Sequence, residues 1–243
     1  MDVVEVLPEL HMFRFRIGQA YLWRDGDELT LIDAGGAHDG PAIIAAVRDL
    51  GFRPEQVRRI VLTHGHPDHT GAAAELAARC GAGISAHRLD APVVRGEAEA
   101  APPVLLDWER PLFEHALTVP PAPPAPVDRE LADGDVLPFG GGARVVAAPG
   151  HTDGSIGIHL PGHGVLFTGD AVAGHEGRAI LGVFNTDRAR ALESFHRLAA
   201  LDCETACFGH GDPLTAGAGR LLRASADRHA VLEVEHGGTL PGA

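Results

Sequence analysis

Four side chains able to bind a metal ion lie within six positions of one segment of the chain. They are His64, His66, Asp68 and His69. The segment follows an apolar run that predicts a β-strand, and Gly65 and Pro67 exclude a regular helix through the ligands. Imidazole and carboxylate ligands together suit a hydrolytic metal site better than a blue-copper redox site. The spacing therefore predicts half of a two-metal centre rather than a polar surface loop.

The geometry of an extended chain explains how one short segment can serve two metal ions. Side chains two positions apart point the same way, so His64 and His66 can bind one ion together. We expect the chain then to turn into a helix over Thr70–Cys80. That bend would direct Asp68 and His69 towards a second ion.

Three further candidate ligands, His151, Asp170 and His210, each follow a glycine at the predicted end of a strand. Glycine permits a sharp turn and a close approach of the backbone to an ion. One such residue alone would be a weak signal, but three of them beside the first four indicate one site. Asp33 also ends an apolar strand, where it could support a ligand loop by hydrogen bonds or simply close a turn.

Taken together, these motifs resemble the metallo-β-lactamase superfamily over nearly the whole chain. The resemblance implies a mixed α/β (α+β) fold, a four-layer αββα sandwich with the metals at one edge between two sheets. It implies two sets of ligands: His64, His66 and His151 for the first metal, and Asp68, His69 and His210 for the second, with Asp170 bridging them. Histidines at the second metal are more similar to the hydroxyacylglutathione hydrolase (glyoxalase II) and lactonase branches than to lactamases proper.

The activity expected of this site is dinuclear metal-dependent hydrolysis. Two ions about 3.5–4 Å apart can hold a bridging hydroxide that attacks the carbonyl of a small thioester or lactone. The expected catalytic residues are Asp170, between the ions, and Asp68, which could carry a proton to the leaving group. Two Zn²⁺ per chain are the expected cofactors, with iron or manganese as alternatives.

Other activities fit the same motifs. Persulfide dioxygenases resemble them but use a single iron, β-lactam hydrolysis is a further alternative, and a sensing module would keep the fold without turnover. Glutathione is doubtful as a substrate component, because the chain contains no lysine and only a short C-terminal tail. Arg178, shortly after Asp170, could pair with a substrate carboxylate or be a solvated loop residue.

The composition narrows the class of protein. With 20 basic and 33 acidic residues the net charge is -13, and no basic cluster offers a surface for nucleic acid. The acidic start lacks the features of a secretory signal, and no window is apolar for long enough to span a membrane. We therefore expect a cytoplasmic protein with a small-molecule substrate and neither a nucleic-acid nor a membrane partner; the oligomeric state is left open.

The remaining pattern predicts two similar halves, each with a series of strands followed by helices. The expected strands are Val3–Val6, Met12–Ile17, Tyr21–Arg24, Leu29–Asp33, Arg59–Leu62, Gly83–Ala86, Val136–Phe139, Ala143–Ala148, Ser155–Leu160, Val165–Thr168 and one ending at Phe208. The other expected helices are Pro41–Leu50, Thr186–Leu201 and one from about Ala216. We expect residues 1–243 to form one domain with a proline-rich insert at about 88–127, either a strap over the core or a lid on the substrate pocket.

Overall fold

In residues 1–236, which the computed structural model of the protein describes, the strands form a seven-stranded sheet, a five-stranded sheet and a two-stranded hairpin. The strands are β1 (Asp2–Leu7), β2 (Leu10–Arg14), β3 (Gln19–Asp25), β4 (Glu28–Ile32), β5 (Val57–Val61), β6 (Gly83–His87), β7 (Arg129–Leu131), β8 (Val136–Leu137), β9 (Ala143–Ala147), β10 (Ile156–Leu160), β11 (Val165–Phe167), β12 (Val172–His175), β13 (Arg178–Leu181) and β14 (Thr205–Cys207). The helices are α1 (Gly40–Asp49), α2 (Pro67–Thr70), α3 (Ala73–Cys80), α4 (Ala91–Val94), α5 (Arg110–Ala116), α6 (Arg188–Ala199) and α7 (Ala218–His236), with short 3-10 turns η1 (Pro54–Gln56), η2 (Asp107–Glu109) and η3 (Gly169–Ala171). The predicted domain end at residue 243 lies outside the described residues.

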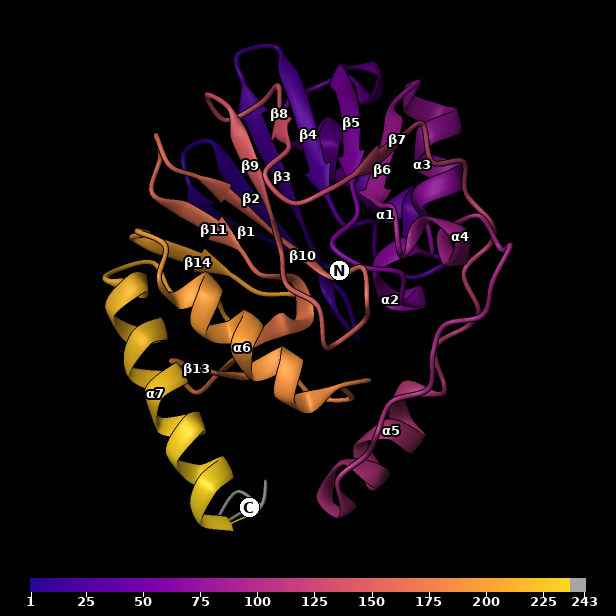
Figure 1. Cartoon of the computed structure of the whole chain (residues 1–243). Coiled ribbons are helices and arrows are strands. Elements are labelled where there is room, and N and C mark those ends of the chain that lie inside the picture. Colours follow the sequence, from indigo (N-terminus) through magenta and orange to yellow (C-terminus); the bar gives the residue numbers. More distant parts are fainter. Residues whose placement is uncertain (237–243) are drawn as a thin grey trace.

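Three buried apolar clusters separate the layers (Figure 1). Ile43 and Leu76, from α1 and α3, pack in the cluster on the outer face of the seven-stranded sheet. Trp23 and Phe167 fill the cluster between the two sheets. Phe195 of α6 lies in the third cluster, which α7 also covers. The order helix, sheet, sheet, helix confirms the predicted αββα sandwich, and within the described residues no helix is long and apolar enough to span a membrane.

The directions of the strands bring the candidate ligands to one edge. Strands β4 to β7 are parallel to one another. In the other sheet β9 and β11 are both antiparallel to β10, and β14 is parallel to β11, so β9, β11 and β14 run the same way. Residues at the carboxyl ends of such strands meet at one edge of a sheet, where α/β proteins commonly place their sites. The loops after these ends carry Asp33, the segment 64–69, His151, Asp170 and His210.

The single helix predicted over Thr70–Cys80 is wrong, because the chain forms α2, a break, and then α3. The break is at Gly71, whose amide donates to the Gly35 carbonyl at 2.9 Å. A Cβ atom on Gly71 would lie 2.3 Å from the backbone nitrogen of Ala37, so this approach of two backbones requires glycine. A contact between distant parts of the chain thus ends a helix that the local pattern would continue.

Three short strands, β7, β12 and β13, and the short helices α4 and α5 were not predicted from the sequence. β7 has three residues, too few to show alternation, and it forms by pairing with β6. β12 and β13 form a hairpin where the pattern indicated a loop around Gly174–Arg178; Glu176 and Gly177, both with positive φ, make its turn. The other predicted strands and helices are present, with ends shifted by up to three residues.

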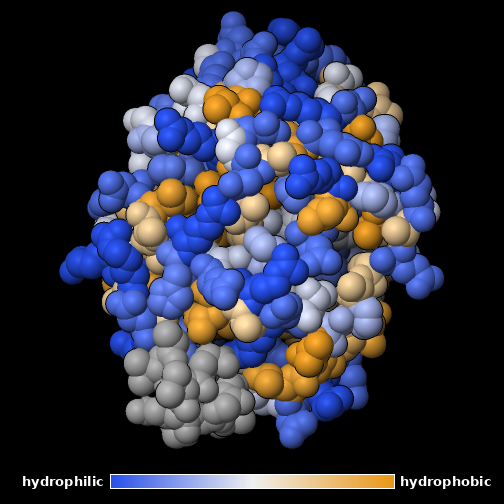
Figure 2. All heavy atoms as spheres, viewed as in Figure 1, coloured by the Kyte–Doolittle hydropathy of each residue, from blue (hydrophilic) through white to orange (hydrophobic). Residues whose placement is uncertain are grey.

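The insert at 88–127 combines features of a strap and of an exposed element. Near its ends, Val94 and Ala125 are buried in the first apolar cluster, and the Ala125 amide donates to the Val94 carbonyl at 2.9 Å. Its middle, η2 and α5, projects from the body of the molecule (Figure 1). Leu112 and Leu117 in this part are 51% and 68% exposed, and Figure 2 shows hydrophobic surface over α5.

Replacing Gly71 by alanine should destabilise the protein, since the added methyl group overlaps the backbone of residues 36 and 37. We expect the free energy of unfolding, measured by chemical denaturation, to fall by about 1–3 kcal/mol. Gly162→Ala is the matched control, because nothing lies within 4 Å of a Cβ atom there. A loss in Gly71→Ala no larger than in the control would contradict the close approach.

Candidate metal centre

The seven candidate ligands converge at the edge where the carboxyl ends of both sheets meet. The first group brings together three ring nitrogens: Nε2 of His64 lies 3.1 Å from Nδ1 of His66, which lies 2.9 Å from Nε2 of His151. His64 and His151 are buried and His66 is half-buried. Three nitrogens this close together, from two sheets, could hold one metal ion.

A second group lies beside the first. Asp68 Oδ2 is 3.4 Å from His69 Nε2 and 3.2 Å from His210 Nε2, and the two imidazole nitrogens are 3.4 Å apart. These three atoms could hold a second ion. The bend into α2 at Pro67 therefore separates the two pairs of ligands within one loop, as the spacing predicted.

Asp170 lies between the two groups. Its Oδ2 atom is 3.1 Å from His210 Nε2 and 3.6 Å from His151 Nε2, so one oxygen faces both. Its Oδ1 atom is buried and lies 3.4 Å from His69 Nε2, but no contact within the described residues gives it a hydrogen bond of good geometry. A buried carboxylate oxygen normally has a partner, and a cation held by the surrounding nitrogens would provide one. The residues present thus fit a pair of metal ions.

The Nδ1 atoms of two ligand imidazoles, on the side of the ring away from the neighbouring ligands, contact polar groups of the protein. Nδ1 of His64 lies 3.1 Å from Thr63 Oγ1, and Nδ1 of His151 lies 3.0 Å from the Val183 carbonyl. The carbonyl can only accept, so His151 carries its proton on Nδ1 and leaves Nε2 free. Hydrogen bonds of this kind orient metal-binding histidines.

Asp33 links two strand ends beneath the centre. Its Oδ2 atom lies 2.9 Å from His69 Nδ1, and its carboxylate accepts from the Thr63 amide at 2.7 Å and the Thr63 hydroxyl at 2.8 Å. Its backbone φ of 61° is left-handed, an uncommon conformation that Asp tolerates better than most residues. These contacts orient His69, which a simple turn residue would not do.

Asp90 is a positioning residue that the sequence reasoning missed. Its Oδ2 atom accepts from the Gly65 amide at 2.8 Å and the Thr152 hydroxyl at 2.7 Å, and its Oδ1 atom accepts from the Gly154 amide at 2.8 Å. It thereby joins the loop of His64 to the loop of His151. The available signal was its place three residues after the end of β6, at the start of the segment 88–127 that the sequence predicted as an insert.

The loop of His210 has its own support. Gln19 is buried, and its amide nitrogen donates to the carbonyls of Phe208 at 2.8 Å and Gly211 at 2.6 Å. The Tyr21 hydroxyl also donates to the Phe208 carbonyl at 2.8 Å. These bonds join the start of β3 to the backbone on both sides of His210.

The two groups differ in electrostatic state. Burial, with the neighbouring imidazole of His66, lowers the pKa of His151 to about 3. Burial alone would also lower the pKa of His210, but the carboxylates of Asp170 and Asp68 outweigh it and raise that pKa to about 10. The first group is therefore neutral, while the second is held together by charge when no metal is bound.

Arg178, the predicted carboxylate-binding residue, lies elsewhere. It is exposed beside the turn of the β12–β13 hairpin, and no hydrogen bond or ion pair joins it to the ligands among residues 1–236. Of the two roles that the sequence allowed for Arg178, that of a solvated residue fits the structure better, although the segment forms a hairpin rather than a loop.

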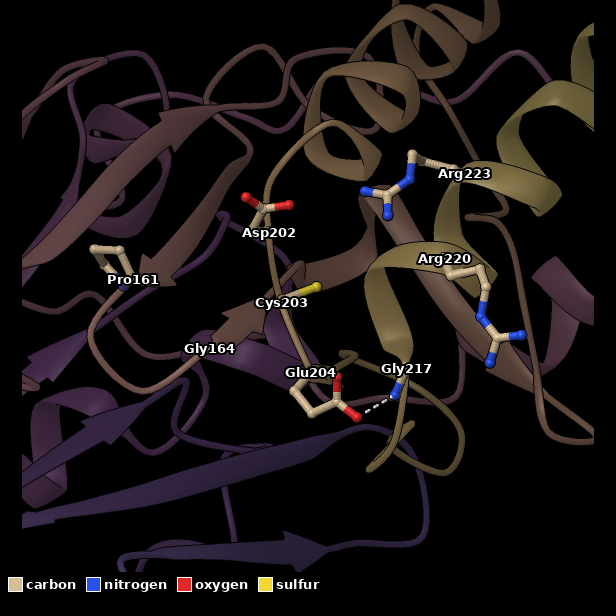
Figure 3. Close-up of a pocket in the computed structure, with 8 residues that line it drawn as sticks. All are labelled: Pro161, Gly164, Asp202, Cys203, Glu204, Gly217, Arg220 and Arg223. Carbon is tan, nitrogen blue, oxygen red and sulfur yellow. Dashed lines mark hydrogen bonds between the residues drawn. The ribbon is translucent and has the colours of Figure 1, made fainter.

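A cavity of about 480 Å³ also lies apart from the ligands. Figure 3 shows it between the segment of Asp202 and Glu204 and the start of α7, which carries Arg220 and Arg223. Its acidic and basic side chains are mixed, Glu204 accepts from the Gly217 amide at 2.7 Å, and none of the seven ligands lines it.

Comparison with known proteins agrees with this arrangement. The sequence model of the metallo-beta-lactamase superfamily matches residues 13–210. The chain is 33% identical over 204 residues to hydroxyacylglutathione hydrolase of Rhodobacter capsulatus, covering 83% of this chain and 64% of that protein. It is 29% identical over 232 residues to the probable metallo-hydrolase YflN of Bacillus subtilis (strain 168), covering 87% of each. The chain thus spans less than two thirds of the first relative.

Solved structures share the fold. Rm3 metallo-beta-lactamase superposes with a TM-score of 0.72 over 98% of this chain and 96% of that one, at 23% sequence identity. At this identity the likeness concerns the arrangement of sheets and helices, not the substrate.

Asp90→Asn should weaken the centre without removing any ligand. The asparagine NH₂ group would face an N–H or hydroxyl donor, leaving a buried donor unpaired at a cost of about 1–3 kcal/mol of stability. We expect the affinity for zinc, measured by competition with a chromophoric chelator, to fall by about 10- to 100-fold. Asp128→Asn is the control, since Asp128 accepts from the Ile84 amide at 2.8 Å at the other end of β6. Equal zinc affinity in both variants would refute the positioning role.

Zinc binding should release protons. At pH 8 His210 is protonated in the metal-free protein, because its pKa is about 10, whereas a metal ligand must be neutral. We expect release of at least about one proton per chain at pH 8, and an apparent affinity that rises with pH up to about 10. Calorimetry in buffers of different ionisation enthalpy measures the release. Binding without proton release would contradict the raised pKa.

Proposed function

This chain belongs to the metallo-beta-lactamase superfamily, and from that premise we propose that it is a dinuclear metal-dependent hydrolase of a small thioester or lactone. The observation that carries the proposal is Asp170, whose carboxylate faces both ligand groups and has one buried oxygen without a hydrogen bond among the described residues. The similarity to a hydroxyacylglutathione hydrolase supports a thioester in particular.

Two ions would be held by the two groups of ligands, with Asp170 shared. The mixed imidazole and carboxylate donors favour Zn²⁺, with iron or manganese as alternatives. When bound, the ions supply a Lewis acid for the substrate carbonyl and lower the pKa of water towards neutrality. Asp33 and Asp90 keep the ligand loops in place for that pair.

The reaction adds water across the acyl bond. The water oxygen bonds to the carbonyl carbon, the C–S bond of a thioester or the ring C–O bond of a lactone breaks, and the leaving sulfur or oxygen gains a proton. Asp68 lines a cavity beside the centre, and the carboxylate oxygen that does not face His69 and His210 can hold that proton and pass it to the leaving group. Gly18 covers the same carboxylate, since a Cβ atom there would lie 3.3 Å from Oδ2.

The presence of both ligand groups favours two metals over one. The donor atoms of Asp68, His69 and His210 lie within 4.8 Å of one another, as do those of the first group, so each group offers a place for an ion; a persulfide-type iron dioxygenase would use a single iron, and the metal count separates the two activities. β-Lactam hydrolysis and sensing without turnover are outcomes that the following experiment distinguishes.

Protein purified without added metal and then loaded with zinc should bind about two ions per chain and hydrolyse members of a thioester and lactone panel that also includes β-lactams. Asp170→Asn should bind fewer ions and lose activity by about 100-fold. His196→Ala, an exposed histidine on α6, is the control.

Other outcomes would replace the proposal. One iron per chain with oxygen consumption would favour the redox activity. Hydrolysis of β-lactams alone would assign the lactamase reaction. Full zinc occupancy with no hydrolysis of any substrate would favour a sensing role.

A further inference from the structure

A cavity of about 300 Å³ opens directly beside the metal ligands. Asp68 lines it together with the β2–β3 turn, the loop after β4 and residues 118–120 of the insert. The turn packs on the centre, because Gly18 approaches the Asp68 carboxylate closely. Ligand pockets range from about 300 to 1,000 Å³, so this cavity suits a small group or one part of a larger substrate.

One wall of the cavity is apolar and fixed. Phe15, Ile17 and Val119 contribute to it. The Phe15 ring packs on the bare backbone of Gly35, where a Cβ atom would lie 2.8 Å from the ring. This wall can accommodate a short hydrocarbon chain, whose burial removes apolar surface from water.

Arg16 lies on the same turn and is the cationic side chain here without an acidic partner. Within residues 1–236 its guanidinium makes one long hydrogen bond, from Nη2 to the Thr118 hydroxyl at 3.5 Å, and no carboxylate lies within 4.0 Å of it. Arg14, two positions earlier, is in contrast paired with Asp212. The guanidinium of Arg16 is thus available, in a chain whose net charge is -13.

The other charged groups of the cavity are already engaged. Asp39 accepts from the Gly36 amide at 2.8 Å, and Asp68 belongs to the second ligand group. His38 also lines the cavity and is exposed. Asp39 keeps its negative charge but is held towards the Gly36 amide, so an anionic substrate group would find its favourable partner in Arg16.

We propose that this cavity binds the acyl chain of the substrate and that Arg16 pairs with a carboxylate at its far end. The substrate class is then the monothioester of a short dicarboxylic acid, with the scissile carbonyl at the metal centre. The planar fork of arginine matches a carboxylate in two parallel hydrogen bonds. This inference rests on the proposed function. It assigns the binding of a substrate carboxylate to Arg16, which lines the cavity, instead of Arg178, which is not among the lining residues.

The test compares two thioesters of the neutral thiol N-acetylcysteamine, glutaryl and pentanoyl, which have acyl chains of equal length and differ in the terminal carboxylate. Zinc-loaded wild-type protein should show a kcat/KM about tenfold higher for the glutaryl thioester, mainly through KM. Arg16→Gln should remove this preference by lowering kcat/KM for the glutaryl thioester to about the value for the pentanoyl thioester, and Arg16→Glu should reverse the preference. Arg58→Gln, an exposed arginine on β5, is the control and should keep the preference.

The competing outcomes are separable. Hydrolysis of both thioesters at equal rates, or loss of the preference in Arg178→Gln rather than in Arg16→Gln, would overturn the inference and leave the proposed function standing. If neither thioester is hydrolysed, the proposed thioesterase function fails for these substrates, and equilibrium binding decides the inference. Calorimetry should then show glutarate binding zinc-loaded protein about tenfold more tightly than pentanoate, with the difference lost in Arg16→Gln; equal affinities would overturn it.

Discussion

The burial of carboxylates among imidazoles is the constraint on which this molecule depends. Asp170 lies between two groups of metal-binding side chains, and burial of its charge is costly unless opposite charge compensates it. Protonated His210 supplies part of that compensation, since its pKa is about 10 when no metal is bound. One oxygen of Asp170 nevertheless has no hydrogen bond in the described part of the chain. His69 faces the same oxygen at 3.4 Å, and the neighbouring carboxylates also raise its pKa, so the buried carboxylates and these two histidines compensate one another.

The fold meets this constraint by tying ligand loops to one another. Asp33 joins the end of β4 to the loop after β5, and Asp90 joins that loop to the one after β9. Gln19 and Tyr21, on β3, hold the backbone just before His210. Each tether is a buried polar group with satisfied hydrogen bonds, an arrangement that fixes geometry as well as adding stability. These tethers therefore fix the loops that carry the candidate ligands.

What the sequence predicted depended on how local each feature is. The ligands and the strand ends could be predicted, because an apolar run, a glycine and a metal-binding side chain follow one another within a few positions. The segment around His64 is an example. The break at Gly71 was not, since it follows from the approach of Gly35 and Ala37, more than 30 positions away. The positioning role of Asp90 could not be predicted for the same reason, because its hydrogen-bond partners belong to loops that are 25 and more than 60 positions away in the sequence.

The insert shows how substrate choice and metal binding can share one element. Glu109, in η2, is buried, and its carboxylate accepts from the Phe184 amide at 3.3 Å. The neighbouring carbonyl of Val183 holds the Nδ1 atom of His151, so the insert packs on the segment that orients a ligand of the first group. About ten positions later the same insert, at Thr118, borders the cavity beside the second group.

The insert therefore reaches both sides of the centre while its own exposed residues stay outside the ligand network. Changes in residues 118–120 would alter the wall of the cavity without touching a hydrogen bond to any ligand. Changes at Glu109 would act on His151 through the backbone at Val183 and Phe184. The segment that local sequence described only as irregular thus divides into a part that shapes the substrate space and a part that supports the metal site.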